Sequence, residues 1–328
     1  MHLAKLLPVA VKEDKSRLPP QLLEKLKPLK TRRPGRFLLE LVGAWLVIFS
    51  VIALAVHLDH WLMTVTAILL VATRQNILGL LVHDQAHCTG FKPYPGDIIA
   101  NLFAAYPLMV LTVEGYSRIH LTHHAKYFTE QDPDHIRKSG EEWNYPMRTA
   151  QFLKILGGDL LGLNAIKLIK GKQAAPKGRV FVRQNRVPRW LRPAYYLLLA
   201  TILTATGTWG IFLLYWVLPL VTVFQLIVRW GAVCEHQYNR LGARVQENTP
   251  LITMRWWERL LLPNLNFSYH IYHHYFPGIS FSQLPKVHDV FVRHGLVDDE
   301  AVFHGYWSYL RFILSPGTDS DRGESTRQ

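Results

Sequence analysis

Long apolar runs constrain this chain more than any other feature of its sequence. Phe37–Val56 and Trp61–Val82 are two such runs separated by four residues, and Tyr195–Trp230 is a third stretch that is interrupted at Thr206–Gly210. A helix that crosses a bilayer needs about 20 apolar residues. The runs therefore predict four transmembrane helices in two hairpins, although the first half of the third stretch is long enough only when Trp190–Ala194 is counted.

The basic residues are distributed unevenly around these runs. The chain has 37 Lys+Arg against 24 Asp+Glu, and ten of the Lys and Arg residues lie in residues 1–36, whereas the hairpin loop 57–60 has none. The segment 126–192 holds 14 more. Because Lys and Arg favour the cytoplasmic side, these segments and the C-terminal third are predicted to face the cytoplasm. Topology and contact with anionic headgroups account for the net charge of +13, so no nucleic acid partner is expected.

Three parts are expected along this integral membrane protein. Residues 1–36 form a basic cytoplasmic N-terminal arm that is loosely ordered or bound to the membrane surface, 37–314 form one all-α membrane domain, and 315–328 form a polar tail with the composition of disorder. The run Ile98–Val113 is too short to cross comfortably and predicts a re-entrant or interfacial helix. Leu251–Leu262, which has paired tryptophans and follows a helix-start signal, predicts a second interfacial helix.

Nine of the 16 histidines fall into four short groups with the local sequences HDQAH, HLTHH, EH and HIYHH. The first and third groups follow directly after predicted spans, and the other two lie in predicted cytoplasmic segments. The topology therefore places all four groups on one side of the membrane, near the interface. The nine residues are His83, His87, His120, His123, His124, His236, His270, His273 and His274.

The spacing of these histidines predicts a metal centre with two ions. Residues at i, i+3 and i+4 share one face of a helix, so each multiple group presents a row of imidazoles. Packing nine imidazoles together without a metal would leave buried ring nitrogens unpaired, which is costly, and nine ligands are too many for one ion. Spacing leaves the metal open, because zinc would favour tetrahedral sites and hydrolysis whereas iron would favour oxygen chemistry. With two cysteines and no CxxC pair, a thiolate site is excluded.

The order of the four groups in a four-span protein resembles the membrane-bound fatty acid desaturase superfamily, the histidine-box di-iron desaturases and hydroxylases. Asp132-Pro133-Asp134 after the second group, Asn264-Leu265-Asn266 before the last group, and Pro277 and Leu284-Pro285 after it also resemble that family's surroundings. The resemblance covers about residues 37–300. It implies a cytoplasmic helical cap on four spans, with the dinuclear site held on the cytoplasmic face.

The resemblance further implies the chemistry. Two iron ions (Fe2+) would use O2 as co-substrate to remove hydrogen from an unactivated C–H bond, with the nine histidines as catalytic and metal-binding residues. Asn266, one turn before His270, would contribute to cofactor binding through a water. Electrons would come from an external partner such as a ferredoxin or cytochrome b5 with its reductase, and the substrate would be a lipid or acyl chain in the bilayer.

Three functions remain open at the level of sequence. The first is a desaturase acting on a fatty acyl or lipid-like chain, and the second is a hydroxylase or ketolase on the same scaffold acting on a carotenoid or another lipid-like metabolite. The third is a receptor or metal transporter that uses the histidines for binding only. A transporter should place polar ligands at the bilayer midplane, whereas these groups lie at helix ends and in loops.

Residues near the histidine groups have weaker signals. Asp84, Glu235 and Glu114 either accept a hydrogen bond from a ligand histidine, or are solvated or paired with a nearby Arg. Asn76 lines a substrate channel, pairs with Arg74 or bonds a neighbouring helix. Cys88 and Cys234 are expected to be small buried fillers. The isolated histidines, expected to be ordinary surface or core residues, are His57, His60, His135, His288, His294 and His304.

Overall fold

The computed structural model describes residues 6–109, 111–170 and 187–314. Within these ranges the chain is mostly helical, in agreement with the predicted all-α class, and its strands are the two-residue segments β1 (Ile252–Thr253) and β2 (Phe303–His304), which pair in parallel. The tail predicted at 315–328 lies outside the described residues.

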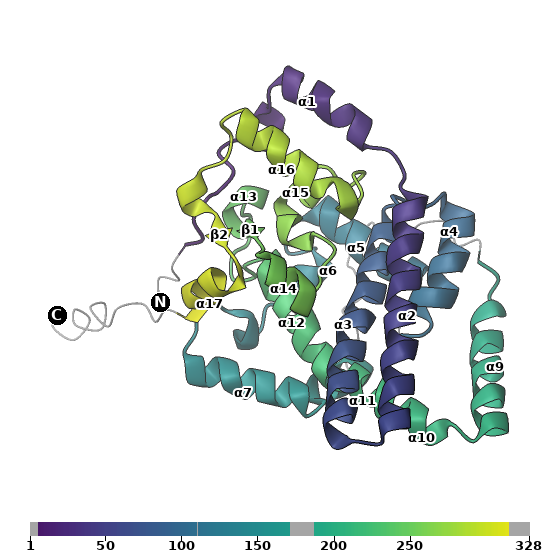
Figure 1. Cartoon of the computed structure of the whole chain (residues 1–328). Helices are drawn as coiled ribbons and strands as arrows, with labels where there is room; N and C mark the ends of the chain where they lie inside the picture. The colour runs from purple at the N-terminus through teal and green to yellow at the C-terminus, as the bar shows by residue number, and fades with distance from the viewer. Residues whose placement is uncertain (1–5, 110, 171–186, 315–328) are drawn as a thin grey trace.

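Three helical elements are long and apolar enough to cross a membrane. They are α2 (Pro34–Leu58), α3 (Trp61–Ala86) and the continuous helical run Trp209–Glu235. The first two form the predicted hairpin, and α3 also packs against the third element (Figure 1). That third element consists of α10 (Trp209–Phe212), the π-helical turn η5 (Leu213–Val217), α11 (Leu218–Val221) and α12 (Val223–Glu235).

The fourth predicted span corresponds to α9 (Leu191–Thr206), whose 16 residues extend about 24 Å along the axis. This is shorter than a hydrocarbon core of about 30 Å, so the predicted number of four spans is not confirmed. The predicted break after Thr206 is present, because Gly207 adopts a φ of 65° and ends the helix. In Figure 1, α9 stands apart from the α2–α3 hairpin, at the right, and its lower end joins α10.

The third span is irregular just before Pro219. Proline has no N–H to donate to the preceding turn, and the helix loosens into the π-helical turn η5 just before it. The carbonyl of Trp216 in this turn accepts a hydrogen bond of 2.9 Å from Nε2 of Gln75, which is fully buried in α3. A polar residue inside one span therefore satisfies the backbone of another.

The segments between the second and third spans are short helices. The predicted helix over Ile98–Val113 is interrupted: helix α4 passes into the π-helical turn η3, which ends at Ala105, and α5 begins at Val113. These elements are α4 (Pro93–Ala100), η3 (Asn101–Ala105), α5 (Val113–Lys126), α6 (Pro133–Arg137), η4 (Glu141–Trp143), α7 (Thr149–Leu160) and α8 (Leu163–Lys170).

The C-terminal part and the segment before α2 pack together. Helix α1 (Pro20–Leu26) lies against α16 (Leu284–Arg293), with Leu22 fully buried between them, and Val11 pairs with Val297 in an isolated bridge. Residues 6–33 are thus packed on the protein. The other elements here are η1 (Lys15–Arg17), η2 (Lys27–Leu29), α13 (Val245–Asn248), α14 (Trp256–Leu261), η6 (Phe267–Tyr269), α15 (His270–Tyr275), η7 (Phe281–Gln283), η8 (Asp299–Ala301) and α17 (Tyr306–Leu314).

The helix predicted over Leu251–Leu262 is wrong at its start. Ile252 and Thr253 pair with Phe303 and His304, and the helix begins only at Trp256. The partner strand lies 51 residues further along the chain, so the local pattern gave no sign of it.

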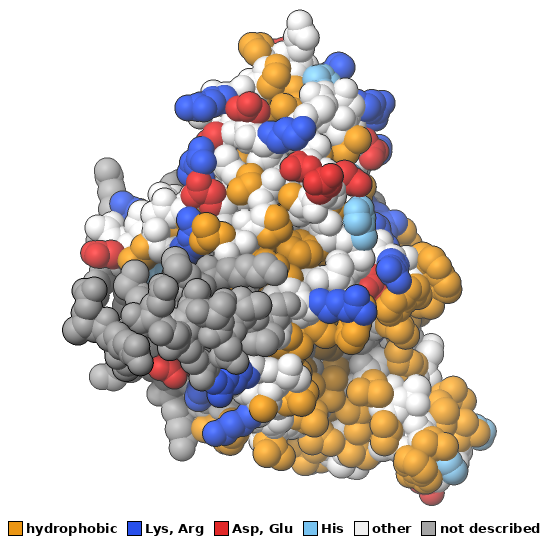
Figure 2. Space-filling view, turned by 90° about the vertical axis from the view of Figure 1, so that its left-hand side faces the viewer, with side chains coloured by type: hydrophobic (Ala, Val, Ile, Leu, Met, Phe, Trp, Pro, Cys, Tyr) orange, Lys and Arg blue, Asp and Glu red, His pale blue; other side chains and the backbone are white. Residues whose placement is uncertain are grey.

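The surface separates into an apolar and a charged region. Figure 2 shows hydrophobic side chains gathered over the lower part of one face and Lys, Arg, Asp and Glu over the upper part. On α2, large apolar side chains such as Leu46 and Phe49 are more than half exposed, at 62% and 64%. Apolar exposure on this scale is costly in water and is typical of lipid contact.

Candidate metal centre

The structure brings the nine predicted histidines together from four segments. His83 and His87 lie at the end of α3, and His236 follows the last residue of α12. The other six come from α5 and α15. Seven of the nine are buried, and His87 and His124 are half-buried.

Residues just before α5 and α15, the two helices that carry three histidines each, determine where these helices begin. Helix α5 begins after Thr112, whose hydroxyl accepts the N–H of Gly115. The side chain of Asn101, fully buried in η3, accepts the N–H of Val113 at 2.9 Å and so fixes where α5 starts. Helix α15 continues from η6, which begins after Asn266; this residue has a φ of 63°, a conformation that asparagine tolerates better than most residues.

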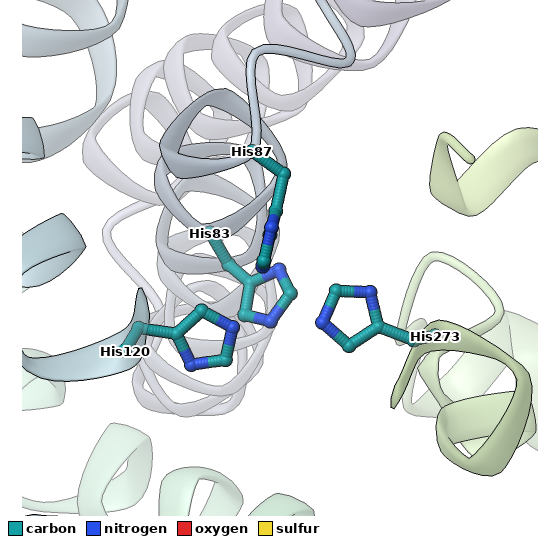
Figure 3. Close-up of side chains that lie close together, drawn as sticks. All are labelled: His83, His87, His120 and His273. Atoms are coloured by element: carbon teal, nitrogen blue, oxygen red, sulfur yellow. The ribbon is translucent and has the colours of Figure 1, made fainter. Parts of the chain in front are cut away.

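One group of histidines contains five imidazoles. His83, His87, His120 and His273 each offer a nitrogen, and these nitrogens all lie within 4.8 Å of one another. Figure 3 shows the four rings from α3, α5 and α15 pointing into one shared space. Nε2 of His124 lies 3.0 Å from Nε2 of both His120 and His273, which adds the fifth member.

A second group contains four imidazoles. His123, His236 and His274 offer nitrogens that lie within 4.8 Å of one another. Nε2 of His270 joins them at 3.1 Å from Nε2 of His274. The two groups are neighbours, because the rings of His124 and His274 stack with their centroids 4.3 Å apart. Five and four imidazoles side by side agree with the predicted dinuclear arrangement.

The nitrogens fit metal ions better than they fit hydrogen bonds. Each imidazole nitrogen carries one hydrogen or one lone pair in the ring plane, yet Nε2 of His274 faces Nε2 of both His236 and His270 at 3.1 Å. Two nitrogens bound at right angles to one ion, each at about 2.1 Å, lie about 3.0 Å apart. Among the described residues, both ring nitrogens of His83 and Nε2 of His123 are buried without a hydrogen-bond partner.

Burial keeps these imidazoles in the form that binds metals. For six of the histidines outside the spans, desolvation by burial lowers the pKa well below the usual 6.5, and the neighbouring imidazoles contribute further. Neutral imidazole is the ligand form. The six are His120, His124, His236, His270, His273 and His274.

Asp132 holds His123 in place through Nδ1 of its ring. Its carboxylate accepts from Nδ1 of His123 at 2.8 Å and from the backbone N–H of Phe128 at 2.8 Å, and it caps α6 through the N–H of Asp134. A carboxylate in this position fixes the tautomer and turns Nε2 toward the group. This role was missed from the sequence, although the Asp-Pro-Asp sequence after the second histidine group was a signal.

His236 is held by a pair of hydroxyl groups. Nδ1 of His236 lies 3.1 Å from Oγ1 of Thr249, and the hydroxyl of Tyr127 lies 2.8 Å from the same oxygen. Tyr127 is in turn bonded to the amide oxygen of Asn248. Neither Thr249 nor Tyr127 was singled out by the sequence.

The predicted partners near the histidines have other roles in the structure. Asp84 accepts the backbone N–H of Phe281 at 3.3 Å, and Glu114 accepts from the amide of Asn101 at 3.2 Å. Asn76 donates at 3.2 Å to the carbonyl of Pro263, which lies in the loop after α14 and not in a neighbouring helix. Cys234 is buried and Cys88 is half-buried, and neither forms a disulfide within the described residues. Among the described residues, the six isolated histidines belong to neither group.

Asn266 lies in neither group of nitrogens. Its Oδ1 accepts from Nη1 of Arg259 at 3.1 Å, and its Nδ2 donates to the carbonyl of Phe281 at 3.3 Å. Its predicted contribution to cofactor binding through a water stays a prediction.

Comparison with known proteins places this site in a family. The fatty acid desaturase family matches residues 59–307, a range that contains all nine histidines, and the chain belongs to this family. A relative, dihydrorhizobitoxine desaturase of Bradyrhizobium elkanii, is 27% identical over 265 residues, which cover 74% of this chain and 72% of the relative. Family and relative indicate an oxidoreductase of the desaturase type, and the three apolar helices fit an integral membrane protein.

Proposed function

We propose that this protein is an O2-dependent di-iron desaturase that introduces a double bond into a fatty acyl or lipid-like chain. The observation that carries the proposal is the cluster of nine imidazoles, divided into five and four, inside a chain of the desaturase family. The name of the relative, which is a desaturase, supports the same reaction type.

Each part of the site has a role in this proposal. The groups around His273 and His274 hold two iron ions, which supply O2 activation and C–H cleavage when bound. Asp132 and Thr249 orient His123 and His236. The ring of Phe267 packs edge-on against His83 with centroids 4.5 Å apart and continues into the apolar core between the spans, which excludes water from this side of the site.

The setting of the reaction is part of the same proposal. The histidines occupy the end of α3 that lies opposite the hairpin loop, which has no Lys or Arg, and the basic N-terminal residues support a cytoplasmic location for the histidine end. Electrons come from an external donor of the ferredoxin or cytochrome b5 type. The substrate reaches the site from the bilayer.

Product analysis tests the reaction. The wild type and His273→Ala are expressed in the same host, and the lipids and metabolites of both are profiled by mass spectrometry. The proposal expects an unsaturated product that is two hydrogens lighter than its precursor with the wild type and none with the variant. A product with one added oxygen would instead identify a hydroxylase or ketolase on this scaffold.

Metal analysis tests the site independently of the substrate. Purified wild type is expected to contain about two iron ions per chain, and His273→Ala and His274→Ala are each expected to lose iron. Active protein with stoichiometric zinc and no iron would contradict the proposal.

A further inference from the structure

A basic cavity opens near the loop that follows α3, and its cationic side chains have no part in the proposed reaction. It has a volume of about 510 Å³ and lies between the start of α2 and the start of α16. Four cationic side chains line it, and no acidic side chain does. They are Arg32, Arg33, Arg36 and Lys286.

The wall of the cavity is fixed to the end of α3. The N–H of Arg33 donates to the carbonyl of Thr89 at 2.8 Å, and Nε of Arg32 donates to the carbonyl of Cys88 at 3.2 Å. A Cβ on Gly90 would lie 2.6 Å from the ring of Phe37, so the loop and the start of α2 are in close contact. Arg33 through its backbone and Arg32 through its side chain are thus held against the loop that follows His87, and this arrangement pre-organises the cavity.

The positive charge in the cavity is only partly neutralised. Arg36 pairs with Glu40 one turn along α2. Within the described residues, no ion pair joins Arg32, Arg33 or Lys286 to an acid. Like charges held together repel, so an anion bound between them would be favoured.

Two buried polar atoms in the lining also have no partner. Gln283 is 7% exposed and lines the cavity, and its Oε1 has no hydrogen-bond partner in the part of the chain that the structure describes. Nε of Arg33 is also buried without a hydrogen-bond partner among the described residues. The first N–H groups of α2, a 25-residue helix, lie at this end and favour negative charge.

We propose that this cavity binds a phosphate group, carried either by a lipid of the surrounding bilayer or by a soluble phosphate ester. A phosphate offers several acceptor oxygens, which match the guanidinium groups of Arg32 and Arg33 and the ammonium group of Lys286. A phosphate monoester also carries a donor hydroxyl for part of the time near neutral pH, which suits Oε1 of Gln283. The cavity lies where the apolar part of α2 begins, at the level of lipid headgroups.

Calorimetric titration of the full-length, metal-loaded protein in an uncharged maltoside detergent tests the site. The probes are dihexanoyl phosphatidic acid, glycerol 3-phosphate and, as the uncharged comparison, dihexanoylglycerol. The test variants are the double change Arg33→Gln with Lys286→Gln and the steric change Ser282→Phe, which narrows the cavity without altering its charge. The matched control is Arg148→Gln with Lys154→Gln, which removes two exposed charges from α7 and its N-cap.

Wild type and control are expected to bind phosphatidic acid at least tenfold more tightly than dihexanoylglycerol, and both test variants are expected to lose tenfold or more of that affinity. If glycerol 3-phosphate binds as tightly as phosphatidic acid, the phosphate group is carried by a soluble ester. If glycerol 3-phosphate binds much more weakly, the phosphate group is carried by a lipid. Unchanged affinity in both test variants, with iron content and melting temperature equal to those of the control, would overturn the proposal.

Discussion

At the scale of single residues, Asp132 connects the metal centre to the fold. It is fully buried and bonds His123, the backbone of Phe128 and the first turn of α6. The change Asp132→Asn keeps the shape and the capping ability of the side chain, because asparagine is as good an N-cap as aspartate. It removes the negative charge that holds Nδ1–H of His123.

Asp132→Asn is therefore expected to weaken metal binding at the second group by about 10- to 100-fold while the first group keeps its ion. Iron should fall from about two to about one per chain, measured by elemental mass spectrometry of purified protein after dialysis against a weak chelator. Asp289→Asn, at an exposed position of α16, serves as the control and should retain full iron. Equal iron in both variants would show that Asp132 does not support the site.

The histidines could be predicted from the sequence, whereas the residues that hold them in place could not. The histidines were predictable because i, i+3 and i+4 spacing is local and the four groups lie beside predicted span ends. Thr249 was not, because it reaches Nδ1 of His236 only after the chain has turned through α13. The backbone of Asn266 is left-handed and its amide oxygen accepts from Arg259, a contact that the spacing to His270 does not reveal, and its predicted role through a water stays a prediction.

The buried imidazoles also predict how the metal-free protein responds to pH. Their folded-state pKa values are depressed by burial, whereas in the unfolded chain histidine titrates near the usual 6.5. Below about pH 6.5 the unfolded state therefore binds more protons, so stability is retained above that pH and lost as the pH falls. Each such group contributes up to about 1.4 kcal/mol per pH unit.

Melting temperatures of chelator-treated protein at pH 7.5, 6.5 and 5.5 measure this response. The first two values should be similar and the third should be markedly lower. A variant with His57→Gln and His60→Gln, which alters histidines at the exposed hairpin turn, should show the same fall as the wild type. A melting temperature that is constant down to pH 5.5 would be inconsistent with neutral buried imidazoles.

At the scale of elements, the contact between α1 and α16 ties the N-terminal segment to the C-terminal part. Leu22 is fully buried in this contact, whereas its neighbour Leu23 is 37% exposed. Leu22→Ala is expected to lower the free energy of unfolding by about 2–5 kcal/mol, because it removes buried methyl groups and leaves a cavity. Leu23→Ala is the matched control and should cost less than about 1 kcal/mol.

Thermal unfolding of the two variants in detergent, followed by circular dichroism, measures the difference. Equal melting temperatures would indicate that the contact between α1 and α16 contributes nothing to stability. The packing of this segment was not visible in the sequence, because residues 1–36 are rich in Lys and Arg and the leucines of α1 share a core with residues of α16, more than 250 positions further along the chain.

Elements defined by local apolar runs were predicted well, and elements defined by distant partners were not. The runs Phe37–Val56 and Trp61–Val82 correspond to α2 and α3 within a few residues at each end. The helix expected at Leu251–Leu262 lost its first turn to pairing with β2, and Ile98–Val113 became two helices joined through η3. In both cases a contact made in the folded chain decided the outcome.

At the scale of the whole molecule, the meeting of all nine histidines in one cluster limits how the chain can cross the membrane. His83 lies at the end of α3 and His236 at the end of α12, and both belong to one cluster. Helix α12 runs toward the cluster, so Trp209, at the start of that span, lies at its far end. The chain must therefore travel from the histidine side to Trp209 before it returns. In Figure 1, α9 covers this path, despite having only 16 residues.

Cysteine labelling decides whether α9 crosses the membrane. In a background with Cys88→Ala and Cys234→Ala, single cysteines are placed at Asp59, Thr208 and Arg293, and intact cells are treated with a membrane-impermeant maleimide. Asp59→Cys and Thr208→Cys should be labelled from outside, because both turns lie at the end of the hairpins opposite the histidines. Arg293→Cys on α16 should react only after permeabilisation. If Thr208→Cys, like Arg293→Cys, were labelled only after permeabilisation, α9 would not cross the membrane. The helical run Trp209–Glu235 would then also begin and end on the histidine side, because His236 lies in the same cluster as His83.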